Sequence, residues 1–454
     1  MEAETSPAST GSRATTTDPT ATDPAAPDPT GWRARWYPLA FGEDLGTDSV
    51  HAVAVHDEPM ALFRDAEGVA RAVVDRCPHR AARLSDGRVE GGELECLYHG
   101  WRFAGDGRCQ HIPQYPAEQG IPRKAHVGAY ATFETQGMVW VWPGDPEWAD
   151  PLAIPTLPAL DGDDCTSIDF AIDLPYEQTF LIENVIDIAH IHVAHDGVRG
   201  GGHRHLAAPL DFEISERTAE GFEGSYRSLG GGEGSALRGA RMSFVAPNLV
   251  HYESLYHDEE LISGLALYSL PVGRNRCRLL YRAYSNFWPA SARRRPRWFE
   301  HWTQCTILEQ DMDVVVGQAA EMRRLGRPPK EVWLPLKSSD GFVLAYRRWL
   351  DEHDAEAPHG VGFAHIATGA DPPPQPFDRF RHHTQICAAC SKIDGRLQAA
   401  KTPLVALVLV LLAVAAVTAP SAFSILAAGL ALLTGGIRWA VDRATIQFRG
   451  PSVG

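Results

Sequence analysis

The pattern of apolar and polar positions divides the chain into regions of different structure. Residues 1–30 are mostly Thr, Ala, Pro, Ser and Asp, so they cannot bury enough apolar surface to fold, and we expect a disordered leader. Short alternating runs in residues 31–150 predict an all-β domain. Residues 151–366 combine long alternating stretches with helical patterns at 298–326 and 340–353. They predict a curved antiparallel sheet with helices, so the chain as a whole is expected to be α+β.

Two uncharged apolar stretches, residues 403–419 and 422–437, lie near the C-terminus and are separated only by Pro420 and Ser421. Each would span roughly 25 Å as a helix, and together they are too long for one membrane span. They predict a transmembrane hairpin over 401–441 with a cytoplasmic tail at 442–454; the alternative is a buried hairpin in a soluble core. Basic residues flank the hairpin while its turn has none, which favours catalytic domains on the cytoplasmic side of the membrane. These residues are Lys392, Arg396, Lys401, Arg438, Arg443 and Arg449.

Charge and cysteine usage exclude several classes of protein. The net charge of −15 leaves no basic surplus to neutralise phosphates, so no nucleic acid partner is expected. The eight cysteines do not form a secreted disulfide framework, which favours a reducing compartment. The glycine-rich loop 230–234 lacks G-x-G-x-x-G spacing, so the chain is not expected to bind NAD(P)H or flavin.

The predicted all-β domain contains a metal-ligand pattern, Cys77-x-His79 and Cys96-x2-His99. A zinc finger would group its two cysteines apart from its two histidines. Here each loop offers one of each, so the two cysteines can hold one iron and the two histidines the other. That arrangement is Rieske [2Fe–2S] ligation.

A second group of polar residues occurs in the otherwise apolar stretch 181–195, LIENVIDIAHIHVAH: Asn184, Asp187, His190, His192 and His195. Buried polar groups need partners, and a metal ion supplies one; two histidines with one carboxylate are typical of non-haem Fe(II) oxygenases. Asp187 and His190 share a helix face. His190 and His195 would lie about 140° apart on a regular helix, so a π-type bulge or a break is expected between them, with His192 as the alternative ligand.

These motifs together resemble the Rieske non-haem iron oxygenases, and within them the pheophorbide a oxygenase-like branch that includes chlorophyllide a oxygenase. The similar stretches are RCPHRAARLSDGRVE, CLYHGWRF, IENVIDIAHIHVAH, LEQDM and FVLAYRRWLDEH. The resemblance implies a helix-grip catalytic domain, a [2Fe–2S] cluster, a mononuclear iron and O2 as co-substrate. It also implies a homotrimer that receives electrons from a separate ferredoxin or reductase.

The resemblance also implies roles for individual residues. Cys77, His79, Cys96 and His99 would hold the cluster. His190 and His195 would bind the mononuclear iron with Asp311 of LEQDM, for which Glu309 and Asp313 are the alternatives. Asp187 would carry electrons from a neighbouring subunit's cluster histidine to His190, or orient His190, and Asn184 would be an outer hydrogen-bonding group.

The expected activity is that of a membrane-anchored monooxygenase acting on a hydrophobic substrate, such as a pyrrolic or polycyclic compound. The acidic, Arg-poor leader is unlike a transit peptide, which favours a bacterial member of the family. The alternative is a Rieske electron-transfer protein without a mononuclear iron.

Cys387 and Cys390 form a Cys-x2-Cys motif in the expected linker 367–400. A redox-switched dithiol is the interpretation that the resemblance favours. A complete zinc site is not expected because no second pair of cysteines is near, although His382 and His383 lie close in the sequence.

Overall fold

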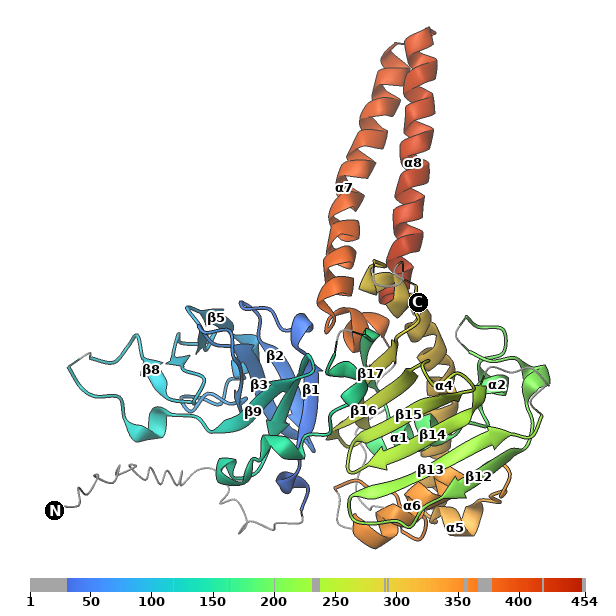
Figure 1. Ribbon diagram of the computed structural model, residues 1–454. Helices are drawn as coiled ribbons and strands as arrows, with labels where there is room; N and C mark the ends of the chain where they lie inside the picture. Colours follow the sequence, from blue (N-terminus) through green and yellow to red (C-terminus); the bar gives the residue numbers. More distant parts are fainter. Residues whose placement is uncertain are drawn as a thin grey trace, which may run out of the picture.

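The computed structural model describes residues 31–450 except 117, 163, 200, 231–236, 290, 292–293, 355–357, 366–377 and 419. The leader expected at residues 1–30, the first part of the expected linker and the last four residues of the expected tail lie outside the described residues. Figure 1 shows a β-rich N-terminal part beside a larger sheet with helices, and two long helices that rise from the junction. This architecture confirms the α+β prediction.

The N-terminal domain consists of two antiparallel sheets, as the alternating pattern predicts. The six-stranded sheet has the order β1-β10-β9-β4-β3-β2, and the four-stranded sheet has the order β5-β6-β7-β8. The loop after β4 carries Cys77 and His79, and the turn between β6 and β7 carries Cys96 and His99. The strands are β1 Tyr37–Phe41, β2 His51–Val55, β3 Glu58–Arg64, β4 Ala70–Val74, β5 Arg88–Glu90, β6 Glu93–Glu95, β7 Arg102–Phe103, β8 Cys109–His111, β9 Ala129–Thr135 and β10 Met138–Trp142.

The second domain is built on a seven-stranded antiparallel sheet with the order β11-β17-β16-β15-β14-β13-β12. Helices α1, α4 and α6 pack their apolar side chains against this sheet in one buried core. The elements are β11 Thr166–Leu174, α1 Gln178–Ile186, α2 Ile191–Ala194, β12 Leu210–Ile214, β13 Gly221–Ser228, β14 Leu237–Val245, β15 Leu249–Tyr256, β16 Ser263–Gly273, β17 Arg276–Ser285, α4 Arg297–Leu325, α5 Pro329–Val332 and α6 Gly341–His353.

The two helical patterns expected in this domain correspond to α4 and α6. Helix α4 ends at Gly326, whose left-handed φ of 58° lets its N–H reach the carbonyls of Met322 and Arg323. Helix α6 is amphipathic, because Phe342 and Tyr346 are buried while Arg348 is exposed. Both helices therefore present a fixed face to the sheet, and α4 carries its polar residues to defined positions.

The C-terminal hairpin is formed by α7 Ala388–Val417 and α8 Ala422–Arg449, with the turn at the expected place. Both helices extend beyond the apolar stretches, so residues 442–449 continue α8 rather than forming a tail. The reason lies at the base, where Arg449 pairs with Asp394 at 2.7 Å and Phe448 packs among buried residues. Helix α7 also runs through Pro403, as helices in membranes often do.

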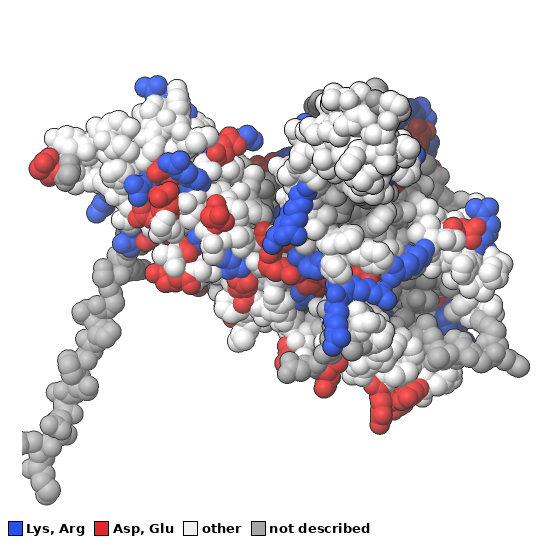
Figure 2. All heavy atoms as spheres, turned by 90° about the horizontal axis from the view of Figure 1, so that it is seen from above, with Lys and Arg blue, Asp and Glu red and all other residues white. Residues whose placement is uncertain are grey.

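Both hairpin helices are long and apolar enough to cross a membrane. In the apolar stretch of α7 no residue is buried, and in that of α8 17% of the residues are buried. The hairpin therefore does not form the core of the described part of the chain. In Figure 2 the end of the hairpin is seen from above without charged residues, and basic side chains lie beyond its outline. This exposure disagrees with the alternative of a hairpin buried in a soluble core and weakly supports membrane association.

Candidate metal centres

The stretch 181–195 contains a break, but it precedes His190 rather than lying between His190 and His195 as their spacing predicted. Helix α1 ends at Ile186, and Asp187 adopts an extended conformation with ψ of 100°. The Asp187 carboxylate accepts a hydrogen bond from the N–H of Ala189 at 2.9 Å, which stabilises the turn out of the helix. His190 and His195 then lie at the two ends of the single-turn helix α2. The break precedes His190 and allows both imidazoles to face the same space.

Three side chains meet at this point. The Nε2 atoms of His190 and His195 lie 3.6 Å and 3.2 Å from Oδ1 of Asp311 in α4, and the two imidazole centroids are 5.3 Å apart. Metal-ligating atoms of all three residues lie within 4.8 Å of one another. Asp311 and His195 are buried, whereas the His190 side chain is 20% exposed. The group is therefore open on one side.

The other ring nitrogens fix the orientation of the two imidazoles. Nδ1 of His190 lies 2.5 Å from the Asp187 carbonyl oxygen, and Nδ1 of His195 lies 3.1 Å from Oε1 of Gln310. Each Nδ1–H can donate to its oxygen, which leaves the Nε2 lone pairs directed at the Asp311 carboxylate. A proton on Nε2 of His195 would instead be donated to the Asp311 carboxylate, and this hydrogen bond raises the pKa of His195. Lone pairs and a carboxylate that converge in this way fit a cation, and two imidazoles with one carboxylate suit Fe(II).

The alternative ligands lie elsewhere. Glu309 forms a bidentate ion pair with Arg379, and Asp313 is exposed on the other side of α4. Nδ1 of His192 accepts a hydrogen bond from the N–H of His203 at 3.3 Å. The structure thus brings only His190, His195 and Asp311 of these candidates together. Gln310 was missed in the sequence, where its place beside Asp311 was the only signal.

Asp187 and Asn184 lie on the side of this group that faces α1. Oδ2 of Asp187 is 3.7 Å from Nδ1 of His190, so Asp187 contacts His190 through its carboxylate as well as its carbonyl. Asn184 is half-buried in α1, about one turn before Asp187. The structure brings Asp187 into contact with the group through His190.

A buried ion pair holds α1 in place. Arg347 of α6 is fully buried and donates to Glu183 of α1 at 2.6 Å, and Gln318 of α4 donates to the same carboxylate at 2.7 Å. The Arg347 guanidinium also lies over the Phe180 ring at 4.9 Å. Three helices are thus tied together directly before the break at Asp187.

The four expected cluster ligands lie on two adjacent loops of the N-terminal domain. Cys77 and Cys96 are buried, whereas His79 and His99 are half-buried with ring centroids 4.4 Å apart. His79 stacks on Trp101 at 4.9 Å, and its buried Nδ1 has no hydrogen-bond partner within the described part of the chain. A buried nitrogen without a partner is costly, and an iron ion would satisfy it. The loops therefore fit a [2Fe–2S] cluster.

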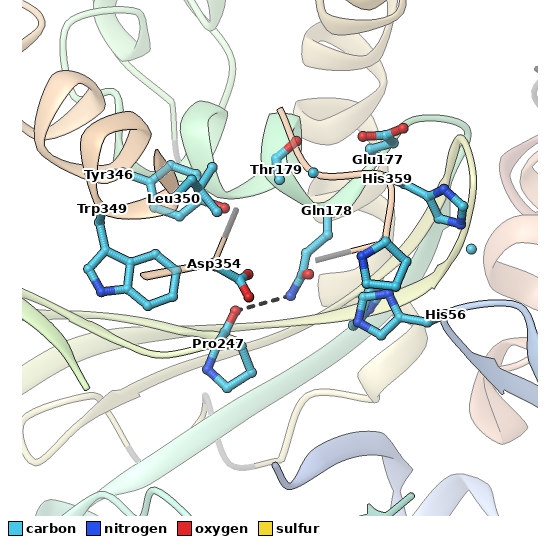
Figure 3. Close-up of a pocket in the computed structure, with 14 residues that line it drawn as sticks. His56, Glu177, Gln178, Thr179, Pro247, Tyr346, Trp349, Leu350, Asp354 and His359 are labelled. Carbon is cyan, nitrogen blue, oxygen red and sulfur yellow. Dashed lines mark hydrogen bonds between the residues drawn. The ribbon is translucent and has the colours of Figure 1, made fainter. Parts of the chain in front are cut away.

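A pocket lies between the two domains (Figure 3). It is lined by His56 from the β2–β3 turn, Gln178 of α1, Trp349 of α6 and Asp354. Gln178 donates to the Pro247 carbonyl at 3.1 Å. Burial raises the pKa of Asp354 to about 7, although Arg35 opposes this. None of the clustered metal-ligand candidates lines this pocket, so it is distinct from both metal-ligand groups.

Family models match both domains. Residues 35–134 match the Rieske [2Fe-2S] domain, and residues 244–329, which include Asp311, match pheophorbide a oxygenase. Solved structures with a similar fold include dicamba monooxygenase bound to dicamba, with a TM-score of 0.59 at 23% identity over 72% of this chain and 99% of that one. This likeness supports the fold alone.

Curated relatives extend the comparison to the whole chain. The chain is 36% identical to the Arabidopsis thaliana protein TIC 55, chloroplastic, over 75% of this chain, but it spans only 64% of that protein and 62% of its Pisum sativum counterpart. It is 30% identical to pheophorbide a oxygenase, chloroplastic, of Arabidopsis thaliana over 92% of this chain and 82% of that protein. The chain therefore belongs to the pheophorbide a oxygenase family of Rieske [2Fe–2S] proteins.

Proposed function

We propose that the chain is a membrane-anchored Rieske monooxygenase that uses O2 and externally supplied electrons to oxidise a hydrophobic substrate. The observation that carries this proposal is the convergence of His190, His195 and Asp311 in a chain that also has a Rieske domain. A Rieske electron carrier needs no second iron site. Two imidazoles and a carboxylate leave iron positions open for O2.

Each set of residues has a role in this proposal. Cys77, His79, Cys96 and His99 hold the [2Fe–2S] cluster, and His190, His195 and Asp311 hold the mononuclear iron. When bound, the two centres supply the electrons with which O2 is activated. Insertion of one oxygen atom into a substrate uses two external electrons, while the other atom leaves as water. No nucleotide motif was identified in the sequence, so a separate ferredoxin or reductase is the proposed donor.

Asp187 would link His190 to a cluster histidine of a neighbouring subunit in this proposal. In Figure 1 the β5–β8 sheet with the cluster loops and helix α2 lie at opposite ends of the molecule. The cluster loops expose Leu97 and Tyr98, with 68% and 60% of their surface accessible. An exposed apolar edge of this kind suits a subunit contact. A head-to-tail homotrimer would bring a cluster histidine to Asp187, which contacts His190.

The substrate is proposed to be a hydrophobic compound with fused or pyrrolic rings. Relatives of the chain are named pheophorbide a oxygenase, chlorophyllide a oxygenase and flavonoid 8-hydroxylase 2. The exposed apolar hairpin would hold the enzyme at the lipid phase into which such compounds partition. Hydroxylation, ring opening, demethylation and oxidative cyclisation are all outcomes of this chemistry.

The orientation and source of the protein are proposals that rest on the sequence alone. The basic flanks of the hairpin favour catalytic domains on the cytoplasmic side, and the composition of the leader favours a bacterial source. The named relatives are chloroplast proteins, so they lend neither proposal support.

The test is an iron count on the detergent-solubilised full chain, purified anaerobically, with EPR of the reduced protein. We expect about three irons per chain and a Rieske signal. His190→Ala should lower the count to about two and keep the signal, whereas His192→Ala, the matched control outside the group, should retain all three. Two irons in the wild type after reconstitution with Fe(II) would instead favour a Rieske electron-transfer protein.

A further inference from the structure

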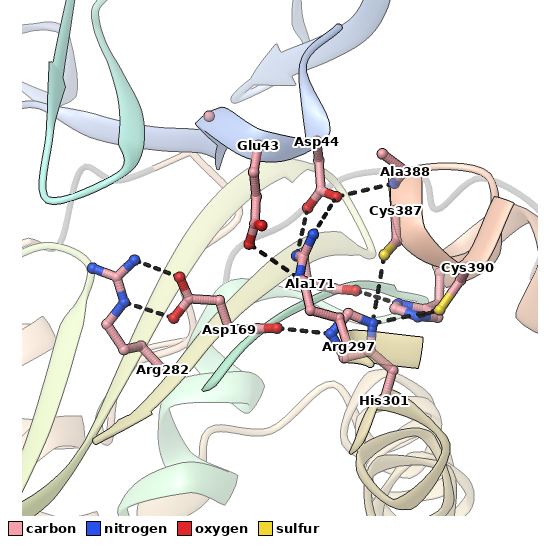
Figure 4. A network of polar contacts seen from close by, with 12 residues as sticks. Glu43, Asp44, Asp169, Ala171, Arg282, Arg297, His301, Cys387, Ala388 and Cys390 are labelled. Atoms are coloured by element: carbon pink, nitrogen blue, oxygen red, sulfur yellow. Dashed lines mark hydrogen bonds and ion pairs between the residues drawn. The ribbon is translucent and has the colours of Figure 1, made fainter. Parts of the chain in front are cut away.

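A second group of metal-ligand side chains lies at the base of the hairpin (Figure 4). Cys387 and Cys390 at the start of α7 meet His301 of α4 and His383 of η9, the π-helical turn Phe380–Thr384. All four residues are buried, and their ligand atoms lie within 4.8 Å of one another. A complete zinc site was not expected from the sequence because no second pair of cysteines is near, but the structure places two histidines beside the cysteines instead. The partners are two histidines, one of them 86 residues away in sequence.

The distances within this group suit a tetrahedral site. Nδ1 of His301 lies 3.4 Å from the Sγ atoms of both Cys387 and Cys390, and Nε2 of His383 lies 3.2 Å from Sγ of Cys390. Zinc–sulfur and zinc–nitrogen bonds of about 2.3 Å and 2.0 Å place tetrahedral ligands about 3.3–3.8 Å apart. The three contacts are close to these separations before any adjustment.

Strand β11 orients both imidazoles. Nε2 of His301 lies 2.8 Å from the carbonyl oxygen of Asp169, and Nδ1 of His383 lies 2.7 Å from that of Ala171. An N–H that donates to a backbone carbonyl fixes the tautomer and leaves the opposite nitrogen with its lone pair. In both residues the opposite nitrogen is the one that faces the cysteines.

We propose that Cys387, Cys390, His301 and His383 bind a structural Zn²⁺ ion that fixes the base of the hairpin to the catalytic domain. Two thiolates and two imidazoles form a complete tetrahedral ligand set without an open position. Zinc binding displaces the two thiol protons, and the Zn²⁺ charge balances the two thiolates in this buried place.

The surroundings favour zinc over a redox-switched dithiol. Both cysteines are only 1% exposed, so a thiol reductant cannot reach either sulfur without local opening. A dithiol also needs no histidines, whereas here two are held in position by backbone carbonyls. The cysteine loop is anchored as well, because Asp44 accepts the Ala388 N–H at 3.0 Å while pairing with Arg297.

The site would join parts of the chain that are distant in sequence. Helix α4 supplies His301, the turn before the hairpin supplies His383, and α7 begins at the cysteines. Phe448 at the end of α8 packs in the same buried cluster as both cysteines. One ion would thus set the position of both hairpin helices on the domain that carries the proposed iron site.

The first test is the zinc content of the full chain, solubilised in detergent after expression with added zinc. We expect about one zinc per chain, and X-ray absorption at the zinc edge should give two sulfur and two nitrogen ligands. The double variant Cys387→Ser/Cys390→Ser should lose the zinc while keeping the Rieske EPR signal. The matched control is Cys165→Ser, a half-buried cysteine outside the group, which should keep both.

Two results would overturn the proposal. One is a wild type without zinc whose two thiols react with alkylating reagents after unfolding. The other is a Cys387–Cys390 disulfide found by mass spectrometry, which would favour the redox dithiol. If the double variant fails to fold, replacement of zinc by Co²⁺ in the wild type still tests the proposal. A tetrahedral site with thiolates gives Co²⁺ an intense visible absorption. The zinc count is independent of the iron count that tests the proposed function.

Discussion

Helix α4 contributes one residue to each of two groups of potential metal ligands, and the two groups differ in every property that matters for function. Asp311 joins His190 and His195, whereas His301, ten positions earlier, joins His383, Cys387 and Cys390. The first group has three ligands and is open at His190, whose side chain is 20% exposed. The second has four ligands and is entirely buried.

This difference corresponds to the distinction between reactive and structural metal sites. A reactive site keeps open positions for substrate or O2, while a structural site is closed by its protein ligands. The types of ligand agree with this distinction. Imidazole and carboxylate suit iron that changes oxidation state, whereas thiolates with imidazoles suit zinc. One rigid helix thus links the proposed reaction to the proposed membrane attachment, and each site can be disturbed separately.

The largest effect is expected from Asp311→Ala. Loss of the carboxylate leaves two imidazoles, which hold Fe(II) weakly, so we expect loss of one iron and a drop in turnover of at least about 100-fold. Zinc and the Rieske signal should remain. Asp313→Ala is the control on the same helix, since Asp313 is exposed. Equal losses in both variants would contradict the assignment of Asp311.

Arg347→Ala should destabilise the chain strongly. It leaves the buried Glu183 carboxylate with Gln318 as its remaining hydrogen-bond donor among the described residues, which typically costs about 3–5 kcal/mol. The midpoint of urea unfolding measures this. Because Glu183 precedes the break at Asp187, the mononuclear iron should be lost at lower urea concentration than the zinc. The control is Arg348→Ala, because Arg348 is the exposed neighbour. Loss of both metals from Arg347→Ala at the same urea concentration would show that the two sites are not separable.

Asp187→Asn tests the electron path with little change in structure. An amide oxygen can still accept the Ala189 N–H, so the break and both metals should persist. Without the carboxylate charge beside His190, we expect turnover with an external donor to fall about 10-fold to 100-fold. The measurement is turnover together with iron content, and Asp313→Asn is the control. Unchanged turnover would remove Asp187 from the electron path.

Much of the fold could be predicted from the sequence, because local patterns determine it. Alternating runs predicted the antiparallel sheets, and α4 and α6 follow from helical patterns. The Cys-x-His and Cys-x2-His spacings placed four residues on two loops that the structure brings together. Such features depend on residues that are neighbours in sequence or on loops of one small domain. Patterns of both kinds can be recognised in the amino-acid sequence.

Other features depend on contacts that no local pattern encodes. His301 carries no signal of a ligand in the sequence, since it acquires its partners only when η9 and α7 pack beside α4. Glu309 and Asp311 look equivalent in LEQDM until Arg379, 70 residues away, is found beside Glu309. The continuation of α8 to Arg449 likewise requires the ion pair with Asp394. Distant packing, rather than residue type, decides each of these cases.

The smallest effect on metal content and turnover is expected at Asp354, which belongs to neither group of ligands. Burial raises the pKa of Asp354 to about 7 from an ordinary value of 3.8, so the folded chain binds a proton that the unfolded chain releases between these pH values. Stability should therefore fall as the pH rises from about 4 to about 7, by at most about 4 kcal/mol from this residue. Asp354→Asn removes the ionisation, so it should raise the melting temperature at pH 8 and change it little at pH 4, with iron and zinc contents unaffected. An equal shift at both pH values, measured by thermal unfolding, would mean that the titration of Asp354 is not the cause.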